Sequence, residues 1–294
     1  MQYVDSGSTD GSVREARSRG VEVVNLDLSI PFTAARARNA GAFALAKRFP
    51  DLRYVQFVDG DCELHPDWID EAVSFLESHA DVAVVFGTQK EREPEATVYN
   101  SLMEIEWDTP LGYCNSCAGN SMFRWEVFSK VGGFRDTLIA GEEPELCVRV
   151  RRTGAKVFHL DAPMAVHDAD VTRFGQWWRR TLRAGHAFAE GAALHGDSPD
   201  RHFAREARSD VFWALLLPLL ILVLAVGHSP WWLLMLLAYP VQVLRVAVRG
   251  RWGMRRNMLN AGFIVLAKFP SLIGALTYHW RTRTHKTPRL IEYK

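Results

Sequence analysis

The chain has 294 residues, which is enough for one large domain or two smaller ones with a full hydrophobic core. Its 34 acidic and 35 basic residues almost cancel, so the overall charge argues against a nucleic-acid-binding protein. Four scattered cysteines, Cys62, Cys114, Cys117 and Cys147, exclude a disulfide-stapled scaffold and indicate a reducing compartment. Neither a charged n-region nor an apolar h-region follows Met1, so we expect no signal peptide.

Strand-like and helix-like patterns alternate through the first part of the chain. We expect strands over residues 2–4, 21–26, 54–61 and 81–89, and helices over residues 12–19, 34–49 and 66–79. This alternation predicts an α/β domain, residues 1–200, with a mostly parallel sheet flanked by helices. Because ligands bind beyond the carboxyl ends of parallel strands, the acidic residues that follow the first and third strands are candidate site residues.

The first of these acidic positions lies in the sequence VDSGSTDGS, which starts at Val4. Asp5 ends the strand, and Ser6, Gly7 and Ser8 follow it with backbone N–H and hydroxyl groups. Such a turn can hold the base and ribose of a nucleotide, with Asp5 accepting hydrogen bonds. The alternative is a structural turn in which a later polar residue caps the next helix.

The second acidic position is the sequence FVDGD, in which Asp59 and Asp61 flank a glycine after a buried strand. Two carboxylates this close raise each other's pKa unless a cation compensates their charge. A hard divalent ion with oxygen ligands, Mg²⁺ or Mn²⁺, would compensate it and would also bridge to phosphate oxygens. The alternative is a solvated turn before a helix.

Together these two motifs resemble a pair found in the family 2 glycosyltransferases, which have the GT-A fold. The resemblance implies that Asp5 contacts the nucleobase, while Asp59 and Asp61 bind the metal ion on the diphosphate of a sugar nucleotide. It also implies an earlier βα unit that contributes to the nucleotide pocket. This chain begins without that unit, so we expect a truncated domain with an incomplete donor site and an exposed sheet edge.

A later segment, residues 117–154, is similar to the acceptor side of the same family. In it Glu142, Glu143 and Glu145 open a helix at the place where the family has Glu-Asp. The resemblance implies that Glu143 is the general base that removes the proton from the acceptor hydroxyl, with Glu142 as the close alternative. The residues alone also allow a simpler interpretation, in which these acids only interact with the dipole of their helix.

The sequence FGQWWRR, from Phe174, is similar to the Q-x-x-R-W box of processive family members, with Arg180 in place of the final Trp. The resemblance implies that the acceptor sugar and the leaving diphosphate contact the following residues: Gln176, Trp178, Arg179 and Arg180. The replacement argues against a processive mode, and the alternative is an aromatic, basic helix at a membrane interface. His167 is either a further metal ligand, as in some relatives, or a partly buried structural histidine.

Long apolar segments dominate the second part of the chain, residues 201–294. Residues 211–227 and 231–248 are each long enough to cross a bilayer, and their short link predicts a transmembrane helical hairpin. A third segment, residues 258–280, contains Lys268 near its centre. Because a lysine at mid-bilayer is costly, we expect an interfacial or re-entrant helix there. The alternative is a buried hairpin in a soluble protein.

The positions of basic residues predict the orientation in the membrane. The loop RGRWGMRRN from Arg249 and the run HWRTRTHK from His279 are strongly basic, and basic flanks stay on the cytoplasmic side. Two crossings would keep both segments and the catalytic domain on that side. We therefore expect a multi-pass protein of the cytoplasmic (inner) membrane that faces the cytoplasm and contacts membrane lipids.

These expectations combine into one predicted function. It is the inverting transfer of a sugar, with Mg²⁺ or Mn²⁺, from a nucleotide-diphosphate sugar to a hydroxyl of a glycan or lipid-linked acceptor in the cell envelope. No nucleic acid partner is expected. The alternatives are a non-catalytic, membrane-anchored subunit of the same fold and a truncated, inactive fragment. A nucleotidyltransferase is disfavoured, because its Gly-rich basic loop is not found near the start.

Overall fold

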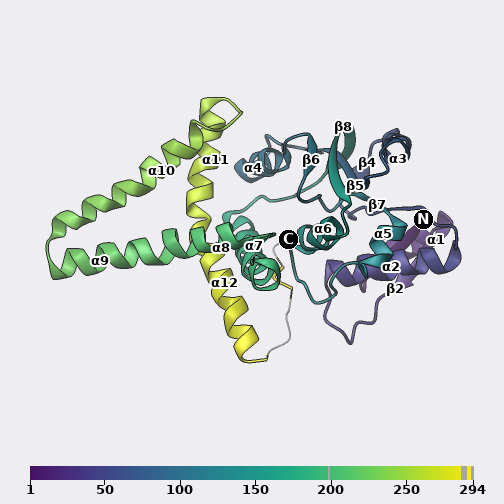
Figure 1. Ribbon diagram of the computed structural model, residues 1–294, viewed down its shortest axis with the longest axis horizontal. Coiled ribbons are helices and arrows are strands. Elements are labelled where there is room, and N and C mark those ends of the chain that lie inside the picture. Colours follow the sequence, from purple (N-terminus) through teal and green to yellow (C-terminus); the bar gives the residue numbers. More distant parts are fainter. Residues whose placement is uncertain (198, 286–289, 293–294) are drawn as a thin grey trace. The chain divides into compact units, whose positions relative to one another are not determined.

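The computed structural model describes residues 1–197, 199–285 and 290–292, which form two compact units (Figure 1). The boundary falls between Asp170 and Val171, earlier than the change of composition near residue 200 predicts. The reason is the helix α7, Phe174–His195, which packs along a helix of the second unit. Lys286, the last residue of the predicted basic run, lies outside the described residues.

The first unit is an α/β domain, and its described elements follow in chain order. They are β1 (Gln2–Asp5), α1 (Ser12–Ser18), β2 (Glu22–Asn25), α2 (Ala34–Arg48), β3 (Tyr54–Gln56), β4 (Cys62–Leu64), α3 (Trp68–Ser78), β5 (Val82–Glu91), α4 (Val98–Trp107), β6 (Gly112–Cys114), β7 (Met122–Arg124), α5 (Trp125–Lys130), α6 (Glu142–Arg152) and β8 (Lys156–His167). Each element that the sequence predicts is present, with ends shifted by a few residues. The predicted α/β class is therefore confirmed.

The predicted mostly parallel sheet is wrong in its strand directions, because the observed pairing is mixed. Strands β1 and β2 form a parallel pair of their own, and a larger sheet has the order β3-β7-β5-β8-β4 with β6 also on β8. Only β5 and β8 are parallel in the larger sheet. The antiparallel partners are three-residue return strands, β3, β4, β6 and β7, which are too short for a pattern to fix their direction.

The predicted strand over residues 54–61 ends early, at Gln56. Phe57 still donates its backbone N–H to the carbonyl of Ser121 at 3.0 Å, but the chain then leaves the strand ladder. The backbone N–H of Asp59 bonds instead to the side chain of Asn120, at 2.8 Å. The acidic sequence therefore forms a turn, which a buried polar side chain holds in place.

A cluster of buried aromatic rings packs on the core side of this turn and holds it in position. The Phe57 ring packs against Phe123, Phe128 and Phe134, with ring centroids 5.1–5.7 Å apart. All four rings are buried. Since Phe57 lies two positions before Asp59, burial of its ring fixes where the carboxylates emerge from the core.

Helix α2 packs against β1 and against the segment around Phe134. Its buried face is made of small residues, and a Cβ added at Gly41 would lie 2.8 Å from a methyl group of Val4 in β1. Asn39 on the same face exchanges two hydrogen bonds with the backbone of Phe134, at 2.7 and 2.9 Å. These contacts fix the preceding residue, Arg38, at the edge of a cavity of about 330 Å³ lined by β1, α2 and the segment after β3.

The second unit is helical. After α7 it contains α8 (Ala204–Val211), η1 (Phe212–Leu216), α9 (Leu217–Gly227), η2 (Pro230–Leu237), α10 (Ala238–Ala247), α11 (Met254–Leu266) and α12 (Lys268–Arg283). Helices α7 and α12 meet through backbone, since a Cβ at Gly185 would strike the Ser271 carbonyl and one at Gly274 would strike that of Leu182. Within the described residues, three helices could cross a membrane by length and composition: Ala204–Gly227, Pro230–Ala247 and Met254–Arg283.

The free-energy cost of placing Lys268 in an apolar segment is lower than the sequence alone suggests. Its ammonium group lies 2.8 Å from the carboxylate of Asp210, and Ser271 donates a hydrogen bond to the second oxygen of that carboxylate. Asp210 is almost fully buried. The pair lowers the cost of placing a lysine in an apolar segment, so Lys268 alone no longer argues against a third crossing.

Candidate active site

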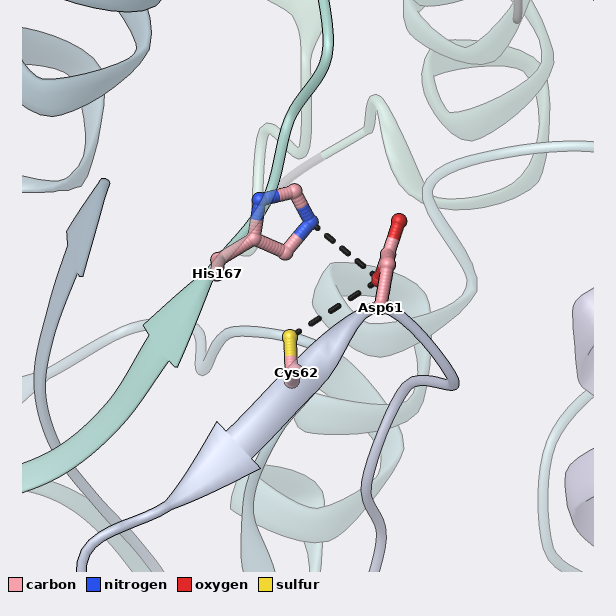
Figure 2. Close-up of side chains that lie close together, drawn as sticks. All are labelled: Asp61, Cys62 and His167. Atoms are coloured by element: carbon pink, nitrogen blue, oxygen red, sulfur yellow. Dashed lines mark hydrogen bonds and ion pairs between the residues drawn. The ribbon is translucent and has the colours of Figure 1, made fainter. Parts of the chain in front are cut away.

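Three potential metal ligands converge at the start of β4 (Figure 2). Asp61 lies just before this strand, Cys62 is its first residue, and His167 ends the neighbouring strand β8. The Nε2 atom of His167 is 3.4 Å from Oδ1 of Asp61, and the Cys62 sulfur is 3.8 Å from the same oxygen. Among the described residues, these three form the one group whose nitrogen, oxygen and sulfur atoms all lie within 4.8 Å of one another.

The predicted ligand set is therefore brought together only in part. Asp61 and His167 lie side by side, whereas Asp59 is not in the group and Cys62 takes its place. Asp59 turns its carboxylate to another partner, the guanidinium group of Arg38, at 2.6 Å. The predicted roles of Asp59, Asp61 and His167 in metal binding stay predictions.

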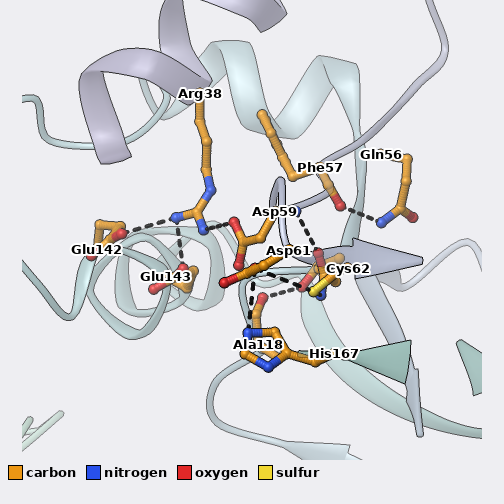
Figure 3. A network of polar contacts seen from close by, with 12 residues as sticks. Arg38, Gln56, Phe57, Asp59, Asp61, Cys62, Ala118, Glu142, Glu143 and His167 are labelled. Carbon is orange, nitrogen blue, oxygen red and sulfur yellow. Dashed lines mark hydrogen bonds and ion pairs between the residues drawn. The ribbon is translucent and has the colours of Figure 1, made fainter. Parts of the chain in front are cut away.

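Arg38 is the centre of a buried charge cluster (Figure 3). Besides Asp59, its guanidinium contacts Glu142 at 2.9 Å and Glu143 at 2.7 Å. Three segments far apart in the sequence, α2, the turn after β3 and the start of α6, thus share one cation. Burial disfavours a charge on Arg38, but the three carboxylates more than offset this and raise its pKa.

The carboxyl of Glu143 is electrostatically distinct. Burial, followed by the neighbouring charge of Glu142, raises its pKa to about 7, while Arg38 acts in the opposite direction. Asp59 adds to the upward shift. A carboxyl group with a pKa near neutrality is matched to accepting and releasing a proton at physiological pH.

Gly119 leaves the space in which these groups meet. A Cβ at this position would lie 2.6 Å from an oxygen of Asp59, 2.9 Å from a guanidinium nitrogen of Arg38 and 3.2 Å from Glu143. The backbone of the loop before β7 therefore passes directly against the charge cluster. A side chain larger than hydrogen would displace at least one of the three charged groups.

Asn120 connects this charge cluster directly to Cys62, next to Asp61. Its carbonyl oxygen accepts the backbone N–H of Asp59, and its amide nitrogen lies 3.0 Å from the Cys62 sulfur and 2.7 Å from the Gln89 oxygen. Asn120 is 1% exposed, so its orientation is fixed by the surrounding core. The acidic turn and β4 are thereby held in one rigid arrangement.

Asp5 stabilises its own turn. Its carboxylate accepts the backbone N–H groups of Gly7 and Ser8 at 3.0 and 3.2 Å, and hydrogen bonds from Ser8 and Gly7 lower its pKa. Ser6 lines the same cavity of about 330 Å³ as Arg38 and Asp59. The two predicted acidic motifs therefore border one cavity, although the predicted contacts of Asp5, Ser6, Gly7 and Ser8 with a nucleotide stay predictions.

Glu145, the third acid of the predicted cluster, has a structural role. It is 1% exposed and forms a close pair with Arg149 at 2.6 Å, with Arg135 at 3.5 Å. Arg149 also donates a hydrogen bond to the carbonyl of Val131 at 2.7 Å. The pair thus ties α6 to the turn that follows α5.

We expect Glu145→Ala to lower the free energy of unfolding by about 3–5 kcal/mol, because it leaves Arg149 partly buried without its carboxylate. Glu63→Ala is the matched control, since Glu63 pairs with Arg92 at 3.1 Å on the surface and such pairs contribute at most about 1 kcal/mol. Thermal or denaturant unfolding of both purified variants would compare them. Equal stability of the two variants would contradict the structural role of Glu145.

The four predicted residues of the Q-x-x-R-W-like box all lie on α7 in the second unit. The side-chain oxygen of Gln176 accepts the backbone N–H groups of Thr172 and Arg173, both at 2.9 Å, and so closes the start of the helix. Trp177 is buried, while Arg179 is exposed. Binding of acceptor or diphosphate by Gln176, Trp178, Arg179 and Arg180 stays a prediction.

The sequence interpretation missed two residues of the site. Arg38 lies in the segment AARARN, where a charge within a helix is usually a solvated one. The signal that could have found it is the small-residue face on either side, which predicts that this part of α2 is buried. Cys62 directly follows the acidic pair, but its position opposite His167 depends on a strand pairing over a long sequence separation.

Comparisons with known proteins bear on the family. Residues 2–134 match the family model described as Glycosyl transferase family 2. The glycosyltransferase AglE of Haloferax volcanii is 26% identical to this chain over 190 residues, which make up 62% of this chain. The chain covers only 60% of the length of that relative.

A solved structure is similar over most of the chain. The mannosyltransferase PcManGT of Pyrobaculum calidifontis, in complex with GDP-Man and Mn²⁺, has 16% sequence identity and a TM-score of 0.56. The similarity covers 95% of this chain and 77% of PcManGT. At this identity the likeness concerns the fold alone, and it confirms the predicted GT-A architecture. With its sequence match, its mixed central sheet and its strand-end acidic motifs, the first unit is similar to glycosyl transferase family 2, whose family model matches residues 2–134.

Proposed function

We propose that the first unit transfers a sugar from a nucleotide-diphosphate sugar to a hydroxyl group, with inversion at the anomeric carbon. The observation that carries this proposal is the cluster around Arg38, which places a carboxyl of raised pKa, Glu143, beside the strand-end carboxylate Asp59. Ser6 and Asp59 line one cavity of about 330 Å³, which offers a place for a donor nucleotide. The family match and the complex of PcManGT with GDP-Man support this choice of donor.

The transfer is a single displacement. The acceptor oxygen forms a bond to the anomeric carbon while the bond from that carbon to the diphosphate oxygen breaks, and the bonding electrons leave with the nucleoside diphosphate. The hydroxyl proton passes to the carboxylate of Glu143, which its pKa of about 7 keeps substantially ionised at neutral pH. Arg38 positions Glu143 and Asp59 at once, so base and donor site keep a fixed spacing.

Asp61 and His167 are the residues that would hold Mg²⁺ or Mn²⁺. Their oxygen and nitrogen atoms are 3.4 Å apart, and a carboxylate and an imidazole are ligands that Mn²⁺ accepts. When bound, the ion would neutralise charge on the departing diphosphate. Asp59, whose carboxylate is paired with Arg38, would lie beside this ion and near the donor nucleotide.

The second unit supports a membrane location for the acceptor. Helix α9 and the segment η2, which precedes α10, leave most of their large apolar side chains exposed, and they are linked through His228 and Ser229 (Figure 1). We therefore propose that Ala204–Gly227 and Pro230–Ala247 cross the cytoplasmic membrane and contact its lipids, with α12 packed along α7. A lipid-linked or envelope glycan fits this location, and the basic loop from Arg249 would then face the cytoplasm.

The rival function is a non-catalytic membrane-anchored subunit of the same fold. A transfer assay with labelled UDP- and GDP-sugars, Mn²⁺ and membrane lipid extract would separate the two, because only an enzyme releases the nucleoside diphosphate. Asp61→Ala is expected to lower the rate at least about 100-fold, whereas Asp70→Ala, which removes an exposed acid on α3, should not change it. Binding of donor without turnover by the wild type would favour the rival.

A further inference from the structure

We propose that Cys62 is a metal ligand together with Asp61 and His167, so that this site prefers thiophilic divalent cations, such as Co²⁺ or Zn²⁺, to Mg²⁺. The inference rests on the metal site of the proposed function, and it concerns which cation that site selects. It replaces the predicted ligand Asp59 by a sulfur atom, and so changes the chemical class of the cofactor.

The strand pairing places the sulfur at the site. Cys62 and His167 are directly opposite each other in the antiparallel pair β4–β8, where side chains of opposed residues lie on the same face. Asp61, just outside the strand, turns its carboxylate back towards both of them (Figure 2). The backbone carbonyl of Asp61 accepts the N–H of Asp168 at 3.0 Å, which fixes this entry into the strand.

The distances suit a small ion. Tetrahedral bonds of about 2.0–2.3 Å place two ligand atoms roughly 3.3–3.8 Å apart. The observed separations from Oδ1 of Asp61 are 3.4 Å to Nε2 of His167 and 3.8 Å to the Cys62 sulfur. Three protein ligands would leave a fourth position for an oxygen of the donor diphosphate.

Buried polar groups lie behind two of the three ligands, and one of them forms a hydrogen bond to its ligand. The amide nitrogen of Asn120 donates a hydrogen bond to the Cys62 sulfur at 3.0 Å and so orients it, although burial raises the pKa of this thiol to about 12 without a metal ion. Behind His167, the fully buried carboxylate of Glu91 lies 3.8 Å from Nδ1, a buried atom without a hydrogen-bond partner. A carboxylate on this side of the ring is usual for a metal-binding histidine, but 3.8 Å is longer than a hydrogen bond, so Glu91 does not by itself fix the orientation of the ring.

The donor set decides the preference. Mg²⁺ requires near-octahedral oxygen coordination and retains its water, so it gains little from sulfur or nitrogen. Thiolate and imidazole ligands favour Co²⁺ and Zn²⁺, and a bound divalent cation deprotonates a coordinating thiol outright. If Cys62 were only a packing residue, its replacement by serine would leave the metal preference unchanged.

The test is a Co²⁺ titration of the full chain in detergent, without nucleotide, followed by optical absorption and calorimetry. We expect a sulfur-to-cobalt charge-transfer band in the near ultraviolet, and competition by Zn²⁺ at far lower concentration than by Mg²⁺. Cys62→Ser should abolish the band and weaken Co²⁺ binding at least about tenfold, whereas Cys114→Ser, a cysteine outside the site, should change neither.

The outcomes separate this inference from the proposed function. Co²⁺ binding that is lost in Asp61→Ala but shows no charge-transfer band and no response to Cys62→Ser would overturn the role of Cys62 and leave the metal site standing. No Co²⁺, Mn²⁺ or Zn²⁺ binding in the folded wild type would overturn both. Circular dichroism of each variant would show that it is folded.

Discussion

Glu143→Gln is expected to lower kcat/KM for sugar transfer by about 10²–10⁴-fold, because glutamine keeps the size of the side chain but cannot accept the proton of the acceptor hydroxyl. Its amide oxygen can still accept a hydrogen bond from Arg38, which lies 2.7 Å from Glu143, so the charge cluster should keep its shape. The measurement is initial rate against acceptor concentration, at saturating donor.

The pKa of Glu143 predicts how kcat/KM changes with pH. The base is active when deprotonated, and the pKa of Glu143 is about 7, so kcat/KM should rise with pH up to about 7 and level off above it. Below that value the rate should fall about tenfold for each pH unit. Glu142, Asp59 and Arg38 all face this carboxyl, so the observed pKa belongs to the group of charges. In Glu143→Gln the acidic limb should disappear.

Glu142→Gln is the matched variant, one residue away and on the same guanidinium nitrogen. The substitution removes a negative charge that raises the pKa of Glu143. The acidic limb of the profile of kcat/KM against pH should therefore move to lower pH in this variant, while most of the rate is retained. A larger loss in Glu142→Gln than in Glu143→Gln would transfer the role of base to Glu142.

Gly119→Ala is expected to lower transfer about 100-fold or more, although it adds a single methyl group. The new Cβ would lie 2.6 Å from Asp59 and 2.9 Å from Arg38, so the charged groups must move apart. Displacement of about 1 Å in a catalytic group is enough for a loss of this size. The acidic limb of the pH profile should also shift, since the distance from Arg38 to Glu143 would change.

The control is Gly262→Ala, because a Cβ at Gly262 meets no atom within 4 Å. Both variants should have similar secondary structure by circular dichroism, so a loss confined to Gly119→Ala reports on the site. Unchanged kcat/KM in a folded Gly119→Ala variant would show that the charge cluster around Arg38 is not used in catalysis.

The sequence predicts local elements well because their signals are local. The helices α2 and α3 and the long strand β5 occupy the predicted segments, since each has an apolar pattern over many residues. The acidic residues of the turns after β1 and β3 could be predicted as candidate site residues because they follow the ends of strands. Their family-level interpretation also agrees with the matched residues 2–134.

Contacts between distant segments escape such an interpretation. Arg38 meets Glu143 across 105 positions, and Cys62 faces His167 because two short strands pair in one register. A shift of that register by one residue would turn Cys62 to the opposite face. The small residues around Arg38 indicate only that this part of α2 is buried, and Cys62 does not differ locally from an ordinary strand residue, so the tertiary fold is needed to identify the partners of both.

Contacts between distant segments also change the interpretation of Lys268 in the second unit. Lys268 argues against a crossing when only its neighbours are considered, because the cost of an isolated charge in lipid is high. Its partner, Asp210, comes from a different helix and removes much of that cost. A charge in an apolar segment therefore has to be judged with the groups that the fold places beside it.

Calorimetric titration of the full chain with UDP and GDP, with and without Mn²⁺, tests most directly whether the acidic motifs form one site for a metal ion and a diphosphate. The account predicts binding that requires the cation and is lost in Asp61→Ala and in Arg38→Ala. Equal affinity with and without Mn²⁺, or no binding of either nucleotide by the folded wild type, would contradict it.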